Sequence, residues 1–87
     1  MDRIDAMKVF VAIVDEGSLA GAARRLGRSA AAVSRAIGYL EAHTGTALLH
    51  RTTRSVKLSV AGERYAAACR RILLDLDEAD VIAAGER

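Results

Sequence analysis

Gly27, Arg28 and Ser29 form a three-residue interruption between two segments of helical periodicity, and this spacing restricts the fold more than any other feature of the chain. Ser18 is placed to cap the first segment, and Gly27 is expected to end it. Apolar residues follow the i, i+3, i+4, i+7 pattern at Leu19, Ala22, Ala23 and Leu26. The two alanines of this set are small enough to let helices cross closely. Two short helices joined by such a turn with Gly are typical of a helix-turn-helix.

The second helix of the pair is predicted over residues 29–44 and has two different faces. Ser29 is expected to cap it, and Gly45 to take the left-handed conformation at its end. One face carries Val33, Ala36, Ile37 and Leu40, and the opposite face carries Ala31, Arg35, Gly38 and Ala42. Because short side chains let a helix approach another surface closely, we expect the second face to lie against a macromolecule. A DNA major groove is wide enough to admit one helix.

Composition favours a mainly α fold in a single globular unit. The chain has 87 residues, of which 52% are hydrophobic and only 3% aromatic, so its core must consist of Leu, Ile, Val and Ala packed helix on helix. The single cysteine, Cys69, cannot form an internal disulfide, and no signal peptide or membrane-spanning run is apparent. A cytoplasmic location is therefore expected.

A further helix is predicted before the helix-turn-helix. Asp2 is a candidate N-cap, and Gly17 is expected to end the helix. One face is predicted to carry Ile4, Met7, Val11 and Val14, with Phe10 and Ile13 beside it.

The pattern changes after residue 46. Residues 47–50 and 56–58 read as two short strands, and residues 51–55 as the polar loop that joins them. This arrangement predicts a wing, so residues 1–58 are expected to form a winged helix-turn-helix with a short two-stranded wing.

Residues 59–87 are predicted to form a long linker helix for dimerisation. Ser59 is its expected cap, and Glu63 lies in the first turn, where the helix dipole favours an acid. The capping box is incomplete, because Gly62 occupies the position that requires Glu or Gln. From Ser59 to Ala84 the helix would span roughly 38 Å, more than the rest of the domain can cover. A seam is formed by Tyr65, Cys69, Ile72, Leu76, Ala79 and Ala83, with Leu73 and Ile82 alongside. Two-fold pairing with a second copy is expected, and the alternative is a helix that folds back on its own domain.

Charge is distributed unevenly along the chain, although the net charge is only +2. The region from 24 to 57 contains seven basic residues, Arg24, Arg25, Arg28, Arg35, Arg51, Arg54 and Lys57, and the single acid Glu41. Acids gather near the C-terminus at Asp75, Asp77, Glu78, Asp80 and Glu86. The middle of the chain is therefore suited to a polyanion such as DNA, with a merely solvated basic face as the alternative.

Five motifs in this order and spacing resemble the N-terminal DNA-binding domain of LysR-type transcriptional regulators. They are residues 9–19 (VFVAIVDEGSL), 22–27 (AARRLG), 32–37 (AVSRAI), 48–54 (LLHRTTR) and 61–63 (AGE). The resemblance covers essentially the whole chain. It implies a bacterial winged helix-turn-helix whose linker helix dimerises. It also implies an effector-binding domain, of which these residues contain nothing, so a small-molecule inducer would act only through that domain.

The resemblance places the DNA contacts at the start of the predicted recognition helix, one turn later, and in the wing. The residues are Ser29, Ala30, Ala31 and Ala32, then Ser34 and Arg35, then Arg51, Thr52, Thr53 and Arg54. The three alanines depart from the family pattern, in which Gln or Pro often follows the cap. Because alanine cannot hydrogen-bond a base edge, direct readout is expected to depend more on Arg35 and the wing.

Hydroxyl groups and helix N-termini are expected to bind phosphates, which position the domain without reading sequence. The hydroxyls are those of Ser18, Ser29, Ser34, Thr52 and Thr53. Arg54 at the wing tip is expected to enter the minor groove. Arg24 and Arg25 fit either a solvated face or phosphate contacts, and Tyr39 fits either a DNA backbone contact or the edge of the core.

The sequence contains no convincing catalytic or metal site. His43 and His50 lie apart with no Cys at ligand spacing, and the carboxylates lie mostly at the two ends of the chain. We therefore expect a non-enzymatic protein without cofactors that binds promoter DNA at an inverted repeat as a homodimer, associated with the nucleoid. The alternative is a winged-helix protein-interaction or dimerisation module without DNA binding.

Overall fold

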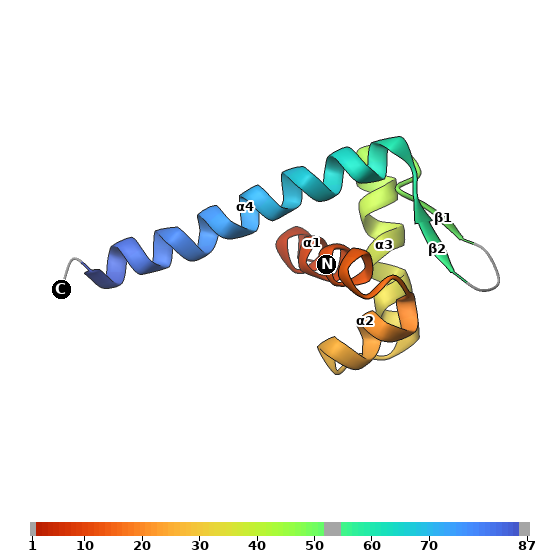
Figure 1. Ribbon diagram of the computed structural model, residues 1–87, viewed down its shortest axis with the longest axis horizontal. Coiled ribbons are helices and arrows are strands. Elements are labelled where there is room, and N and C mark those ends of the chain that lie inside the picture. Colours follow the sequence, from red (N-terminus) through yellow and green to blue (C-terminus); the bar gives the residue numbers. More distant parts are fainter. Residues whose placement is uncertain (1, 52–54, 86–87) are drawn as a thin grey trace.

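Three helices, a two-stranded hairpin and a long fourth helix follow one another in the computed structural model, which describes residues 2–51 and 55–85. The elements are α1 (Arg3–Glu16), α2 (Leu19–Leu26), α3 (Ala30–Thr44), β1 (Leu49–Arg51), β2 (Val56–Leu58) and α4 (Val60–Gly85). Figure 1 shows α1, α2 and α3 packed together, the hairpin beside them, and α4 running past α1 into solvent. This is the predicted winged helix-turn-helix.

Local capping signals set the helix boundaries as predicted. The Asp2 carboxylate accepts a hydrogen bond from the Ile4 amide, and the Ser18 and Ser29 hydroxyls accept from the amides three residues on. Between α2 and α3, Gly27 has φ of 65°, a left-handed conformation that a side chain would disfavour. The helix-turn-helix geometry thus follows directly from the turn residues.

The core is centred on α1, which is buried on more than one side. Phe10 and Ile13 are fully buried, as are Val33, Ile37 and Leu40 of α3. The predicted α1 face accounts for only part of the buried surface: Ile4, Val11 and Val14 are half-buried, whereas Ala6, Val9 and Ala12, outside the predicted set, are buried. The reason is that α1 contacts α2, α3 and α4, so a single apolar stripe does not describe its packing.

The wing is an antiparallel hairpin that starts later than predicted. Leu49 pairs with Leu58, and Arg51 pairs with Val56. Ala47 and Leu48 lie outside the strand, because the Leu48 amide binds the Glu41 carboxylate and the Leu48 carbonyl accepts from Ser59. Arg51 belongs to β1 instead of the loop.

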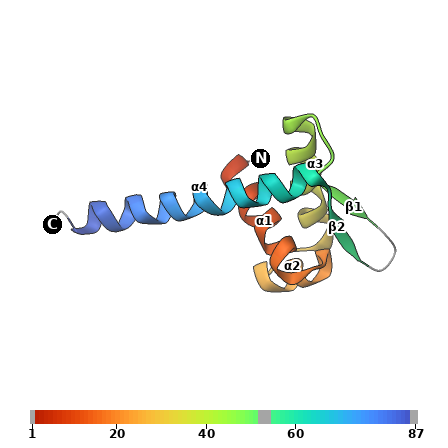
Figure 2. The same cartoon turned by 45° about the horizontal axis from the view of Figure 1, so that its top comes forward.

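The first half of α4 packs on α1, and its second half projects away from the domain. Figures 1 and 2 show the projecting half from two angles, and the molecule measures 50 × 26 × 21 Å. Within the described residues, none of the helices has the length and apolarity needed to cross a membrane.

One residue of the predicted dimerisation seam, Cys69, belongs to the protomer's own core, and a second, Tyr65, is half-buried against that core. Cys69 has no exposed surface, and the Tyr65 ring lies 5.7 Å from the ring of Phe10. Burial raises the pKa of both the Tyr65 hydroxyl and the Cys69 thiol. The assignment of Cys69 to a dimer surface is therefore corrected, because α1 packs against α4 at this point and covers the thiol. Tyr65 remains partly exposed.

Candidate nucleic-acid interface

The outer face of α3 is exposed, as the sequence predicted. Ala31, Arg35, Gly38 and Ala42 are exposed, whereas the opposite side of the helix is anchored in the core. A Cβ added at Gly38 would meet no atom within 4 Å, so nothing in the described protein lies over this part of the helix. Arg35 is the one long basic side chain of this face.

The starts of α2 and α3 present the predicted phosphate-binding hydroxyls. The Ser29 hydroxyl oxygen accepts from the Ala32 amide at 3.1 Å, and Ser18 accepts from the Gly21 amide at 2.9 Å. Ser29 is exposed with Ala30, while Ser18, Ala32 and Ser34 are half-buried. Each capping hydroxyl retains its own proton to donate to an acceptor such as a phosphate oxygen.

Several basic residues counted in the sequence are paired with acids of the same chain. Arg28 binds both carboxylate oxygens of Asp5 at 2.6 Å. Arg25 contacts Asp15 at 3.2 Å and Glu16 at 3.6 Å. The sequence therefore overstates the positive charge that this region offers to a polyanion.

These pairs also shift the ionisation of the acids. The hydrogen bond from Arg28 holds the pKa of Asp5 below its ordinary value. The pKa of Asp15 is lowered first by its hydrogen bond to Arg70 of α4, at 2.5 Å, and then by Arg25. Asp15 thus joins α1 to both α2 and α4.

Arg24, Arg35 and Lys57 form no ion pair with any residue in the part of the chain that the structure describes. All three are exposed. For Arg25, whose role the sequence left open, the contact is with acids of its own chain. Fewer basic side chains are therefore available to a ligand than the number of basic residues in the sequence suggests. Arg35 on the α3 face is one that remains available.

The wing tip lies outside the described residues. The predicted contacts Thr52, Thr53 and Arg54 fall in that segment, and only the backbone of Arg51 is placed, at the end of β1. The base of the wing contacts α3, because the Glu41 carboxylate accepts hydrogen bonds from the Leu48 and Leu49 amides.

Tyr39 packs at the edge of the core and stacks on His43, with ring centroids 5.9 Å apart. His43 in turn is hydrogen-bonded to Arg3 of α1 at 2.8 Å. This favours the packing role for Tyr39 over the DNA backbone contact.

Sequence reasoning missed Glu41 and Gly62. The Glu41 carboxylate holds the amides of Leu48 and Leu49, and Gly62 lets the start of α4 approach the Leu48 carbonyl. The available signals were a lone acid in a basic stretch and a glycine one turn into a helix.

Comparison with known proteins decides the family. Residues 4–63 match the family model described as bacterial regulatory helix-turn-helix proteins of the LysR family. The chain belongs to the LysR family. The fold agrees, with a TM-score of 0.88 and 35% identity to the DNA-binding domain in the CbnR–DNA complex, covering all of both chains. The BenM DNA-binding domain with benA site 1 DNA gives a TM-score of 0.93 at 29% identity, again over both full chains.

Curated relatives named as HTH-type transcriptional regulators are similar to nearly the whole chain. A transcriptional repressor of Pseudomonas aeruginosa is 41% identical over 85 residues, which are 98% of this chain and 27% of the relative. The transcriptional activator AaeR of Escherichia coli is 38% identical over 78 residues, 90% of this chain and 25% of the relative. The chain therefore spans about a quarter of the length of these relatives, which are named as regulators.

Proposed function

We propose that this chain binds double-stranded DNA as the DNA-binding part of a LysR-type transcriptional regulator, with α3 in the major groove. The observation that carries this proposal is the exposed α3 face, on which small side chains surround Arg35. The major groove is about 12 Å wide and admits one α-helix, and short side chains on this face let the helix backbone approach the bases closely. The similar CbnR and BenM domains are described in complexes with DNA, which supports the proposal.

In this proposal, Arg35, the serine hydroxyls with the helix N-termini, and the wing each contact a different part of the DNA. Arg35 contacts a base edge or the phosphate beside it, because a guanidinium suits both guanine and phosphate oxygens. The hydroxyls of Ser18, Ser29 and Ser34, together with the exposed helix N-termini, bind phosphates. The wing, through residues 51–54, reads the adjacent minor groove, and Arg54 is its expected contact.

A homodimer formed through the second half of α4 is part of the proposal. Exposed apolar side chains continue along this half on the predicted seam and beside it, at Ile72, Leu76 and Ile82. Of the predicted seam, Ile72, Leu76, Ala79 and Ala83 remain exposed, and Leu73 is half-buried. Pairing of two copies would cover the seam and set two α3 helices on an inverted repeat, in successive major grooves roughly 34 Å apart.

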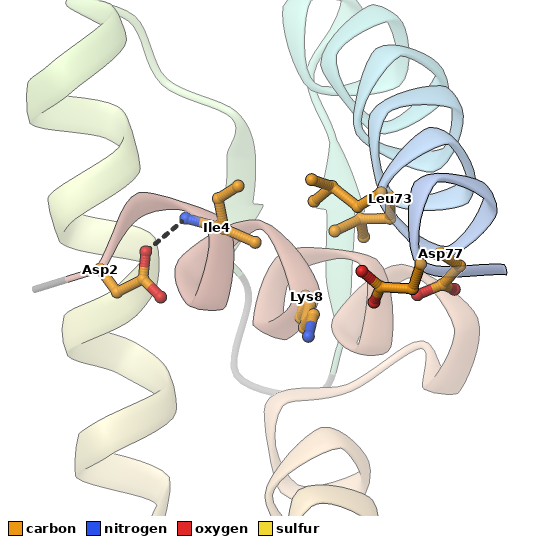
Figure 3. A pocket seen from close by; sticks show the side chains of 7 residues that line it. Asp2, Ile4, Lys8, Leu73 and Asp77 are labelled. Atoms are coloured by element: carbon orange, nitrogen blue, oxygen red, sulfur yellow. Dashed lines mark hydrogen bonds between the residues drawn. The ribbon is translucent and has the colours of Figure 1, made fainter. Parts of the chain in front are cut away.

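The groove between α1 and α4 extends this proposed dimer surface. Figure 3 shows Ile4 and Lys8 of α1 opposite Leu73 and Asp77 of α4. Its lining residues are Asp2, Ile4, Lys8, Leu73, Leu76, Asp77 and Asp80. Apolar side chains flanked by both charge signs suit the side of a second helix.

The remaining parts of the proposal concern the whole regulator. A non-enzymatic DNA-binding role implies a cytoplasmic, nucleoid-associated location. Any small-molecule inducer would act through an effector-binding domain, and the DNA affinity of the present chain requires no cofactor.

Titration of labelled promoter DNA at several salt concentrations, without an effector, tests the DNA-binding proposal. Neutralised phosphates release counterions, so the logarithm of the affinity is expected to fall linearly with the logarithm of the salt concentration. An affinity that stays flat across the series would contradict it. The protein-interaction alternative predicts no DNA binding at any salt concentration.

A further inference from the structure

Glu41 is an acid in a place where DNA binding alone would disfavour one. It is the only Asp or Glu between Arg24 and Lys57, and it lies on α3, the helix that the proposed function places in the groove. A carboxylate near DNA repels phosphates unless its charge is compensated. The presence of an acid at position 41 is therefore to be explained by its contacts within the protein.

The Glu41 carboxylate binds the base of the wing. One of its oxygens accepts from the Leu48 amide at 2.8 Å and from the Leu49 amide at 3.3 Å. Leu49 is the first residue of β1, and both leucine side chains are buried. A charged acceptor on two amides makes stronger hydrogen bonds than a neutral one. The recognition helix thus holds the strand that enters the wing.

The start of α4 holds the same segment from the other side. The Leu48 carbonyl accepts from the Ser59 amide at 3.0 Å, and the Ser59 hydroxyl donates to the Ala47 carbonyl at 2.7 Å. A Cβ on Gly62 would lie 2.0 Å from the Leu48 carbonyl oxygen, so α4 approaches as closely as a glycine permits. Leu48 has its amide held by α3 and its carbonyl held by α4. Figure 1 shows α3, the hairpin and α4 meeting at this corner.

We propose that Glu41 is a positioning residue for DNA recognition: it fixes the hairpin β1–β2 relative to α3, so that helix and wing engage one DNA site together. This inference rests on the proposed function, since it assigns Glu41 a role in the same surface. Glu41 does not touch DNA. It acts through the backbone of residues 48 and 49, and its negative charge is used by those two amides.

The proposal predicts an effect opposite in sign to simple electrostatics. Removing an acid from a DNA-binding surface is expected to strengthen binding when charge alone matters. Glu41→Ala is expected to weaken binding to the preferred site by about ten-fold, because two charge-assisted hydrogen bonds are lost and α3 no longer holds the base of the wing. Glu63→Gln is the control, because it removes the same charge from an exposed position in the first turn of α4. This control is expected to bind equally or more tightly.

The decisive readout is the ratio of affinities for A·T-flanked and G·C-flanked DNA, measured on protein shown to be folded. Loss of stability alone leaves this ratio unchanged, whereas a displaced wing lowers it. Wild type is expected to have the highest ratio and Glu41→Ala the lowest. Glu41→Gln lies between them, because its amide oxygen is a weaker, neutral acceptor. Hydrogen exchange of the Leu48 amide should accelerate in the same order.

An unchanged flank ratio in both Glu41 variants would overturn the proposal, as would a wild type without any flank preference. If Glu41→Ala does not fold, Glu41→Gln decides alone, and full retention of the ratio counts against the proposal. Failure of the proposed function is distinguishable, because wild type and Glu63→Gln would then also bind none of the DNAs.

Discussion

Arg28 and Asp5 form a two-point ion pair, with both nitrogen-to-oxygen distances at 2.6 Å, that ties the turn between α2 and α3 to α1. The residues are 23 positions apart in sequence. Arg28 is one of the basic residues that make the middle of the sequence look suited to DNA. In the folded chain, however, its charge is neutralised by Asp5. The pair therefore contributes to the geometry of the helix-turn-helix more than to its positive potential.

Acid is expected to destabilise the fold through Asp5 and Asp15, whose pKa values are both lowered in the folded state. A carboxyl group of this kind adds stability above its unfolded pKa, and that stability is lost as the pH falls through the folded pKa. The free energy of unfolding should therefore drop from about pH 5 downward. Urea unfolding at a series of pH values measures this drop.

Substitutions test whether Asp5 and Asp15, and not the other carboxylates of the chain, cause this loss of stability in acid. Asp5→Asn and Asp15→Asn should each flatten the acid part of the stability profile, whereas Asp75→Asn, an exposed residue far along α4, should not. Equal profiles for all four proteins would show that these ion pairs do not contribute to acid stability.

Arg35 and Arg54 are expected to differ in the kind of DNA recognition that they support. Arg35→Ala should cost roughly 1–3 kcal/mol on the preferred site and, where the side chain reads a base, relax selectivity at one position per half-site. Arg54→Ala should weaken sites with A·T-rich flanks most and preserve the half-site preference. Binding of both variants to single-base and flank-swapped DNAs measures the difference.

The melting temperature of Arg35→Ala should match wild type, since Arg35 is exposed and has no ion-pair partner among the described residues. If Arg35→Ala and Arg54→Ala lose affinity by the same factor on every DNA, including non-specific competitor, both arginines contact phosphates only and read neither a base nor the groove width.

Leu76→Asp is expected to shift the chain from dimer to monomer, because it places an unpartnered charge in the proposed seam. Val81→Asp is the matched control: Val81 is 69% exposed on the same helix and about half a turn away from the seam. Sedimentation of both variants tests the assignment. The same assembly state for wild type and both variants would contradict it.

Gly62→Ala and Gly38→Ala are expected to change stability in opposite directions. A methyl group at position 62 would clash with the Leu48 carbonyl and should cost about 1–3 kcal/mol or more. Position 38 is an exposed helix site with open space, where alanine should add about 0.5–1 kcal/mol. Denaturant unfolding measures both effects.

DNA binding provides the second readout for this pair. Gly38→Ala should weaken affinity in spite of higher stability, because the methyl lies on the face that approaches the groove. Higher stability with unchanged affinity would show that this part of α3 keeps its distance from DNA.

The boundaries of α1, α2 and α3 and the two faces of α3 could be predicted from the sequence, because they depend on local interactions. Ser18, Gly27 and Ser29 act on amides and backbone angles within three residues of themselves, so their effect does not depend on distant parts of the chain. The side-chain periodicity of residues 33–40 separates the core face from the open face for the same reason. The strand pattern of residues 47–58 predicted the wing, and the family motifs added the expected contacts.

Which charged and apolar residues are available to a partner depends on contacts between segments that lie far apart in the sequence. Arg28 looks free in the sequence but meets Asp5, and Cys69 follows the seam periodicity but is buried because α4 crosses α1. The sequence does not show that Glu41 has a partner, because its carboxylate is bound by the amides of residues 48 and 49 only in the folded chain. Helical periodicity places a side chain on one side of its own helix, but its neighbours depend on where segments distant in sequence pack.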